Sequence, residues 1–130
     1  MPIQVKWLDE EHKIILNKYT GKWDWTELFN AIEQSASLMD TVDHKVAVIL
    51  DMSATNHVPT LNLGAMQKIV GARTSHHPNM THFYMVGIKV YVRAMTDIFS
   101  RLFPRAFAQY KVVKSVEEAL EKIHLPQVTN

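Results

Sequence analysis

The chain of 130 residues has no cysteine, which excludes a disulfide-stabilised scaffold, a thiolate zinc site and a cysteine nucleophile. Glycine is scarce, and the four that are present form no glycine-rich phosphate loop. The longest apolar run, Val46 to Leu50, is far shorter than the roughly 20 residues of a membrane-spanning helix. The N-terminus has no signal-peptide core. We therefore expect a cytoplasmic protein that does not span a membrane.

An excess of charge of one sign is also lacking. Fourteen Lys and Arg residues stand against 13 Asp and Glu residues, for a net charge of +1. This balance gives no electrostatic footprint for nucleic acid or for an anionic membrane, so we expect no nucleic-acid partner. The hydrophobic share of 47% and the length of one average domain predict a single folded domain over residues 1–130.

Hydrophobic patterning predicts an α/β fold. Alternating or continuous apolar runs predict strands at 3–7, 13–19, 46–50, 81–86 and 110–113. Apolar residues spaced by three and four predict helices at 24–39, 63–73, 92–102 and 115–123. Capping boxes open the first and the last helix. The order β-β-α-β-α-β-α-β-α predicts a single open mixed sheet of about five strands with four helices.

Polar residues gather after the central strand, over residues 52–61 that we expect to be loop. In an open α/β sheet, ligands and partners meet the carboxyl ends of the strands. Hydroxyls and amides ahead of a helix can hold an anion, which favours a recognition loop or a small-ligand site. The candidate residues are Asp51, Ser53, Thr55, Asn56, His57, Thr60 and Asn62. A helix cap at Thr60 or Asn62, with a turn closed by Asp51 and Ser53, would explain the same pattern.

The region after the central strand resembles a known family. A buried strand that ends in Asp51-Met52-Ser53, a loop, and a helix that opens with Leu63-Gly64 resemble the anti-sigma-factor antagonist (STAS-like) domain. The helix start Trp23-Asp24-Trp25 and the closing helix from Ser115 are similar to the bacterial SpoIIAA-like branch, which is related in fold to CRAL-TRIO lipid-binding domains. The resemblance implies a non-enzymatic regulatory module that presents this loop to a protein partner such as an anti-sigma-type kinase.

The chain departs from that family at one motif. Antagonists of the partner-switching type carry Asp-Ser-Ser-Gly-Leu-Gly here and are phosphorylated on a serine. This chain has Pro59-Thr60-Leu61-Asn62-Leu63-Gly64, with Leu61 at the position of that serine. Thr60 keeps a hydroxyl beside it and is the candidate phospho-acceptor.

Some residues also suggest a hydrolase site or a histidine metal site. Asp51, Ser53 and His57 are the residue types of a hydrolase, but three such residues close together in one loop rarely converge, and no Gly-x-Ser-x-Gly elbow is present. The adjacent His76 and His77 usually point apart, and no His-Glu-x-x-His spacing occurs. We therefore predict no catalytic residue, solvated loop histidines, no metal and no cofactor.

Methionines suggest an alternative function. Methionine fills core gaps and also lines adaptable apolar pockets. Met52, Met85, Ile88 and Tyr91 are candidate pocket residues between sheet and helices, with core packing as the simpler explanation. A small apolar or amphipathic, lipid-like ligand would fit there, consistent with the lipid-binding relatives.

The opening hairpin and two tryptophans suggest self-association. Trp23 and Trp25 are two positions apart and cannot share a helix face, so we expect at least one to be partly exposed. The hairpin also leaves an edge strand that needs protection. A homodimer would provide it.

Overall fold

The computed structural model describes residues 2–57, 59–60, 62–71, 77–87, 93, 97–98, 100–102, 104 and 110–124. Its strands form one sheet and are β1 (Ile3–Trp7), β2 (Ile14–Thr20), β3 (Val46–Ala54), β4 (Met80–Val86) and β5 (Tyr110–Val113). Its bounded helices are α1 (Trp25–Met39), α2 (Leu63–Val70) and α4 (Val116–His124). Residues 93, 97–98 and 100–102 are also helical, where a helix between β4 and β5 was predicted. The α/β class and the element order are confirmed.

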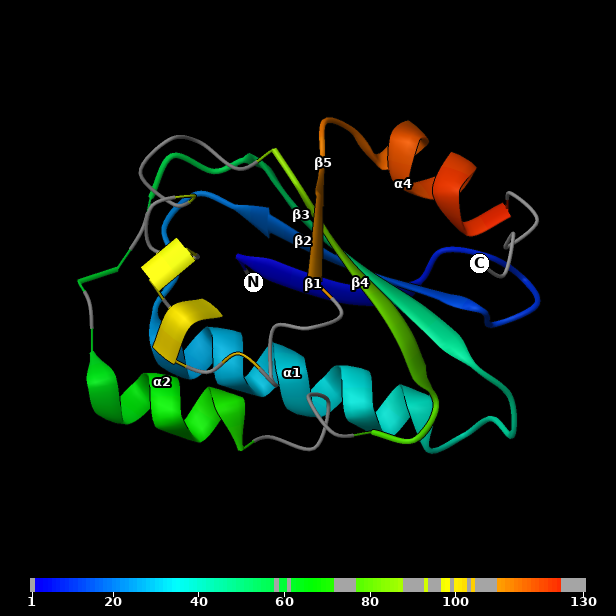
Figure 1. The fold of residues 1–130 in the computed structure, drawn as a ribbon, viewed down its shortest axis with the longest axis horizontal. Helices are drawn as coiled ribbons and strands as arrows, with labels where there is room; N and C mark the ends of the chain where they lie inside the picture. Colours follow the sequence, from blue (N-terminus) through cyan, green and yellow to red (C-terminus); the bar gives the residue numbers. More distant parts are fainter. Residues whose placement is uncertain are drawn as a thin grey trace.

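The strands follow one another across the sheet in chain order, β1-β2-β3-β4-β5. The hairpin makes β1 antiparallel to β2, and all other neighbours are parallel. Right-handed crossovers between parallel strands in this order place every crossover helix on the same face of the sheet. Figure 1 shows α1 and α2 together on one side, with α4 on the opposite side. The sheet is therefore the middle layer of three.

Helix α1 begins as its sequence predicts. The Asp24 carboxylate accepts a hydrogen bond from the Glu27 amide at 2.8 Å, and the Glu27 carboxylate accepts one from the Asp24 amide at 3.2 Å. This reciprocal pair satisfies two of the donors that a helix start leaves unpaired. Further along α1, Ser35 accepts a hydrogen bond from the Asn17 amide group of β2 at 3.0 Å, in buried surroundings. The helix is thus held to the sheet by a polar contact within an apolar layer.

Two hydrophobic clusters cover the two faces of the sheet. The cluster under α1 includes Val46, Val48 and Leu50 of β3, and the cluster under α4 includes Ile49. Since consecutive strand residues point to opposite faces, a strand covered on both sides must be apolar throughout. The first seven residues of β3 are buried, which confirms it as the central strand.

Strand β3 is longer than predicted. Its parallel pairing with β2 continues past a register shift to Thr20 and Ala54. The expectation that residues 52–54 belong to a loop is therefore wrong, because an outer neighbour strand keeps them extended. No helix in the described part of the chain is both long enough and apolar enough to cross a membrane.

Candidate functional site

The candidate site lies at the end of β4, beside the last residues of β3. Asp51 pairs with Val86, the last residue of β4, so the two strands reach the same edge of the sheet. Gly87 follows with φ +71°, in the left-handed region. A Cβ atom at Gly87 would lie 2.6 Å from the Cα atom of Ser53, inside the van der Waals limit. The backbones of the two strand ends therefore approach closely, and only glycine fits between them.

Asp51 and Ser53 form a local hydrogen-bonded pair. One Asp51 carboxylate oxygen accepts hydrogen bonds from the Ser53 amide at 3.0 Å and from the Ser53 hydroxyl at 2.6 Å. Asp51 is buried while Ser53 is exposed. The pair lies within the last residues of β3, so the expected turn at Asp51 and Ser53 is not formed.

His57 does not complete a catalytic trio with that pair. Its backbone amide donates to the Thr55 hydroxyl at 3.1 Å, and its ring makes no hydrogen bond to another described residue. The Ser53 hydroxyl bonds the carboxylate directly, so no imidazole stands between nucleophile and acid as hydrolase chemistry needs. Among the described residues, the geometry therefore offers a carboxylate and a hydroxyl in direct contact, and no imidazole bonded to either.

Three contacts hold the loop between β3 and α2. The buried Thr55 donates its hydroxyl hydrogen to the Gly21 carbonyl at 2.5 Å, and the Trp25 indole donates to the Thr60 carbonyl at 2.7 Å. Asn62 accepts from the Ala65 amide at 3.0 Å and caps α2. The loop is therefore fixed to the start of α1 at one end and to α2 at the other.

Three of the described side chains of the loop are exposed to solvent. Asn56, Thr60 and Asn62 are exposed, whereas Pro59 is buried beneath them. Leu63, in the first turn of α2, is 61% exposed. We call residues 55–57, 59–60 and 62 the presentation loop.

The apolar pocket candidates divide into two groups. Met52 and Met85 lie in the buried cluster under α1, together with Tyr19 and Trp23. Ile88 and Tyr91 lie outside the described residues.

Burial raises the pKa of Tyr19, and the neighbouring Tyr110 raises it further, so the phenol stays protonated.

Trp23 has a buried indole N–H with no hydrogen-bond partner among the described residues. Its ring meets Tyr19 at 5.1 Å and 81°, and Trp25 at 5.6 Å and 86°. Such edge-to-face contacts are favourable between aromatic rings. Trp23 is buried and Trp25 is half-buried, in agreement with the expectation that one tryptophan would be partly exposed.

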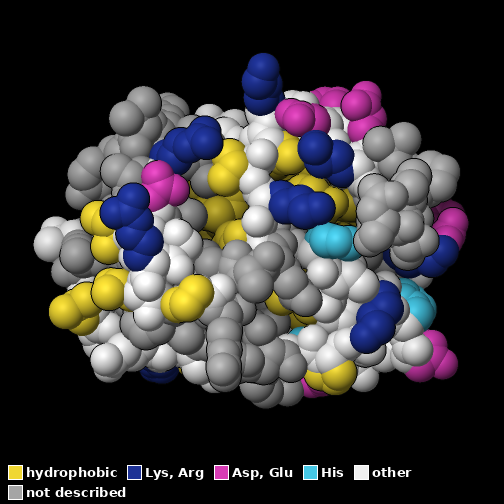
Figure 2. Space-filling model, in the orientation of Figure 1, with side chains coloured by type: hydrophobic (Ala, Val, Ile, Leu, Met, Phe, Trp, Pro, Cys, Tyr) yellow, Lys and Arg dark blue, Asp and Glu magenta, His cyan; other side chains and the backbone are white. Residues whose placement is uncertain are grey.

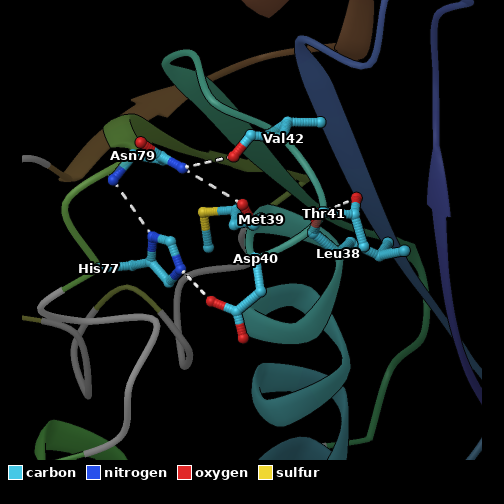
Figure 3. A network of polar contacts seen from close by, with 7 residues as sticks. All are labelled: Leu38, Met39, Asp40, Thr41, Val42, His77 and Asn79. Carbon is cyan, nitrogen blue, oxygen red and sulfur yellow. Dashed lines mark hydrogen bonds and ion pairs between the residues drawn. The ribbon is translucent and has the colours of Figure 1, made fainter.

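His77 departs from the expected solvated histidines. Its side chain is 8% exposed, and its Nε2 atom lies 2.8 Å from an Asp40 carboxylate oxygen (Figure 3). Its Nδ1 atom accepts from the Asn79 amide at 3.1 Å, so Nε2 carries the hydrogen. His77 thus helps to join the end of α1 to the start of β4. The sequence pattern around it, Pro78 and Asn79, did not predict this role.

Neither a metal site among the described residues nor a match to a known protein tells more about the candidate site. Within the described ranges, no three His, Asp or Glu side chains are arranged to hold a metal ion. In comparisons with known proteins, no family model matches the chain, and no curated protein matches it significantly. The function must be inferred from the chain's own side chains.

Proposed function

We propose that this chain is a non-enzymatic, STAS-like regulatory module that presents its loop and the first turn of α2 to a partner protein. The proposal rests on one observation about the presentation loop. Hydrogen bonds hold its backbone in place, while several of its side chains are exposed to solvent. A loop held by Thr55, Trp25 and Asn62 loses little conformational freedom when it binds. Exposed Thr60 and Leu63 then offer a polar and an apolar contact side by side.

Thr60 is the proposed control point of this module, and an anti-sigma-type kinase is the proposed class of partner. Phosphorylation would add about −1.5 to −2 charges beside the start of α2. The helix dipole favours negative charge at that end, so the phosphate would be accommodated there without unfolding the helix. The added charge would change the surface that the partner meets.

A photo-cross-linking experiment tests the presentation loop in cells. A benzophenone amino acid is placed at Thr60 or at Asn56, with Glu121 of α4 as an exposed control position. We expect a discrete cross-linked protein from the loop positions and none from Glu121. Absence of a cross-link from the loop, or the same products from all three positions, would refute the proposal.

Two substitutions test Thr60 as the control point, using the protein that the cross-link identifies. Thr60→Asp imitates the added negative charge, and Thr60→Ala removes the hydroxyl. We expect the two variants to bind the partner at least about fivefold differently, in line with typical coupling free energies. Equal binding by both variants and the unaltered chain would exclude a switch at this position.

The second candidate function is binding of a small apolar or amphipathic ligand between sheet and helices. The specific observation in its favour is the buried Trp23 N–H without a partner among described residues, in the same cluster as Met52 and Met85. A ligand with an apolar body and one acceptor oxygen would satisfy it. Native mass spectrometry of protein purified from cells tests this candidate: an added mass that Trp23→Phe removes supports it, and bare protein contradicts it.

Location and assembly complete the proposal. We propose a cytoplasmic module, and a homodimer formed through the edge strand β1, which has a single neighbour in the sheet. Light scattering of the purified chain distinguishes a dimer from a monomer.

A further inference from the structure

The near-neutral net charge conceals a strong separation of charge along the chain. Residues 52–116 contain eight Lys and Arg residues and one acidic residue, Asp97, for a net of +7. The remaining residues contain six Lys and Arg against twelve Asp and Glu, for a net of −6. A local excess of one sign creates a field that the total charge does not report. The expectation that the chain has no electrostatic footprint therefore needs revision.

The fold places the two kinds of charge on different elements. The basic segment supplies α2, β4, β5 and the helical residues between β4 and β5. The acidic residues belong to the β1–β2 hairpin, α1, the turn after α1, the buried Asp51 of β3, and α4. Figure 1 shows the helical residues of 93–102 on the same side of the sheet as α2. The basic segment thus lies toward the β5 edge of the sheet, which we call the basic flank, and the acidic α1 lies beside α2 on the same face of the sheet.

Exposed aliphatic side chains lie on this same flank. All four large hydrophobic side chains that are exposed among the described residues belong to the basic segment: Leu63 (61%), Ile98 (51%), Leu102 (56%) and Val112 (44%). Ile98 and Leu102 are four positions apart and share one helix face. Figure 2 shows hydrophobic and basic side chains reaching the surface together over α2 and the neighbouring helical residues.

Basic side chains accompany these aliphatic ones on the two helices. Lys68, Arg93 and Arg101 are exposed, and Asp97 is the one acidic residue in the sequence of the basic segment. The Lys68 ammonium lies 4.1 Å from the centre of the Phe29 ring, which holds it near α1 while the residue remains exposed. We call this set the basic apolar surface, and its members are Leu63, Lys68, Arg93, Ile98, Arg101 and Leu102.

We propose that the basic apolar surface binds peripherally to an anionic lipid bilayer. Aliphatic side chains enter the boundary between headgroups and acyl chains, while Lys and Arg meet the anionic headgroups. Protein interfaces are enriched in aromatic anchors, and none of the six members of this surface is aromatic. A nucleic acid would bind the cations through phosphates and leave three large aliphatic residues in water. Binding is peripheral because the segment inserts side chains and not a helix.

Vesicle sedimentation tests the proposal with the whole chain. The probes are vesicles of phosphatidylcholine alone and vesicles in which phosphatidylglycerol replaces part of it. We expect binding to the anionic vesicles to be at least about tenfold tighter, because each basic residue near such a surface contributes severalfold. We also expect added salt to weaken it, since headgroup attraction is screened.

Three double variants separate the contributions of charge and apolar contact. Arg93→Glu with Arg101→Glu should abolish binding, and Ile98→Ser with Leu102→Ser should lower it at least about tenfold. The matched control is Lys6→Glu with Lys122→Glu, which makes the same change in net charge at exposed residues outside the basic segment. The control should bind as the unaltered chain does. Circular dichroism confirms that each variant is folded.

Several outcomes would overturn the proposal. One is equal binding to both kinds of vesicle, or no binding to either. A second is an equal loss in the arginine variant and the lysine control, which would show that only net charge matters. A third is unchanged vesicle binding by the serine variant together with tight binding to duplex DNA, which would assign the surface to a polyanion.

Discussion

At the scale of single residues, the site depends on close packing as much as on polar groups. The strand predicted over 81–86 ends just before Gly87, and the missing side chain of Gly87 is what lets β4 approach Ser53. The requirement follows from the distance between two strand ends that are 34 residues apart in the sequence. A sequence pattern contains no such distance, so this residue could not be assigned its role beforehand.

Replacing Gly87 by alanine should therefore be severe. The new Cβ would meet the Ser53 backbone, and the residue would keep a positive φ that alanine disfavours by about 1–2 kcal/mol. We expect the free energy of unfolding to fall by at least about 2 kcal/mol, because overpacking adds to the conformational cost. Urea denaturation measures the change.

Gly21 provides the matched control for that substitution. Its φ of +60° is similar, but a Cβ there would have no heavy atom within 4 Å. Gly21→Ala should cost only the conformational part, about 1 kcal/mol. Equal losses in the two variants would show that contact with Ser53 is unimportant.

The polar residues of the loop were identified from the sequence, but their roles were not. Asp51, Thr55 and Asn62 are used largely within the fold, as partners of Ser53, Gly21 and the α2 amides. Such residue types suit turns and caps as well as ligands, because the same oxygen atoms serve both. Only their partners in space distinguish the two uses.

At the scale of elements, local signals predicted where helices begin better than where strands end. The Asp24–Glu27 capping box lies within four residues, so the start of α1 could be placed directly. The end of β3 depends on pairing with β2 at Thr20, more than thirty residues earlier. Strand length is set by the neighbour as much as by the strand's own side chains.

The junction between α1 and β4 is another feature that arises between elements. The Asn79 side-chain amide donates to the carbonyls of Met39 and Val42, both at 3.2 Å, where α1 ends (Figure 3). These carbonyls have no donor within the helix itself. His77 adds its contact to Asp40 beside them. The end of α1 is thus satisfied by residues of the loop that leads into β4.

Loss of the Asn79 amide should loosen this junction. We expect Asn79→Ala to lower the free energy of unfolding by about 2 kcal/mol, because the Val42 carbonyl loses its donor and the Met39 carbonyl keeps only the 3.4 Å hydrogen bond from the Val42 amide. Asn79→Asp should cost at least as much, since a carboxylate would face those carbonyls. Thermal and urea unfolding measure both.

An exposed amide elsewhere serves as the control. Gln67 lies on the solvent side of α2, and Gln67→Ala should change stability by less than about 0.5 kcal/mol. A similarly small change in Asn79→Ala would contradict the role assigned to this junction.

At the scale of the whole molecule, the three layers predict an uneven distribution of stability. β3 has strand neighbours on both sides and buried clusters on both faces, whereas β5 has one neighbouring strand. Amides of Val46 to Leu50 should therefore exchange hydrogen most slowly, and those of β5 considerably faster. Hydrogen exchange followed by mass spectrometry or NMR measures this, and protection of β5 equal to that of β3 would contradict it.

The sequence by itself determined the α/β class, the order of elements, the central strand and the capped start of α1. These follow from periodicity and from contacts only a few residues apart, which a linear pattern contains. The tertiary structure decided the full length of β3, the need for Gly87, the engagement of His77, and the gathering of exposed aliphatic and basic residues on one flank. Each of these depends on which distant segments the crossovers bring together, and that information appears only when the chain folds.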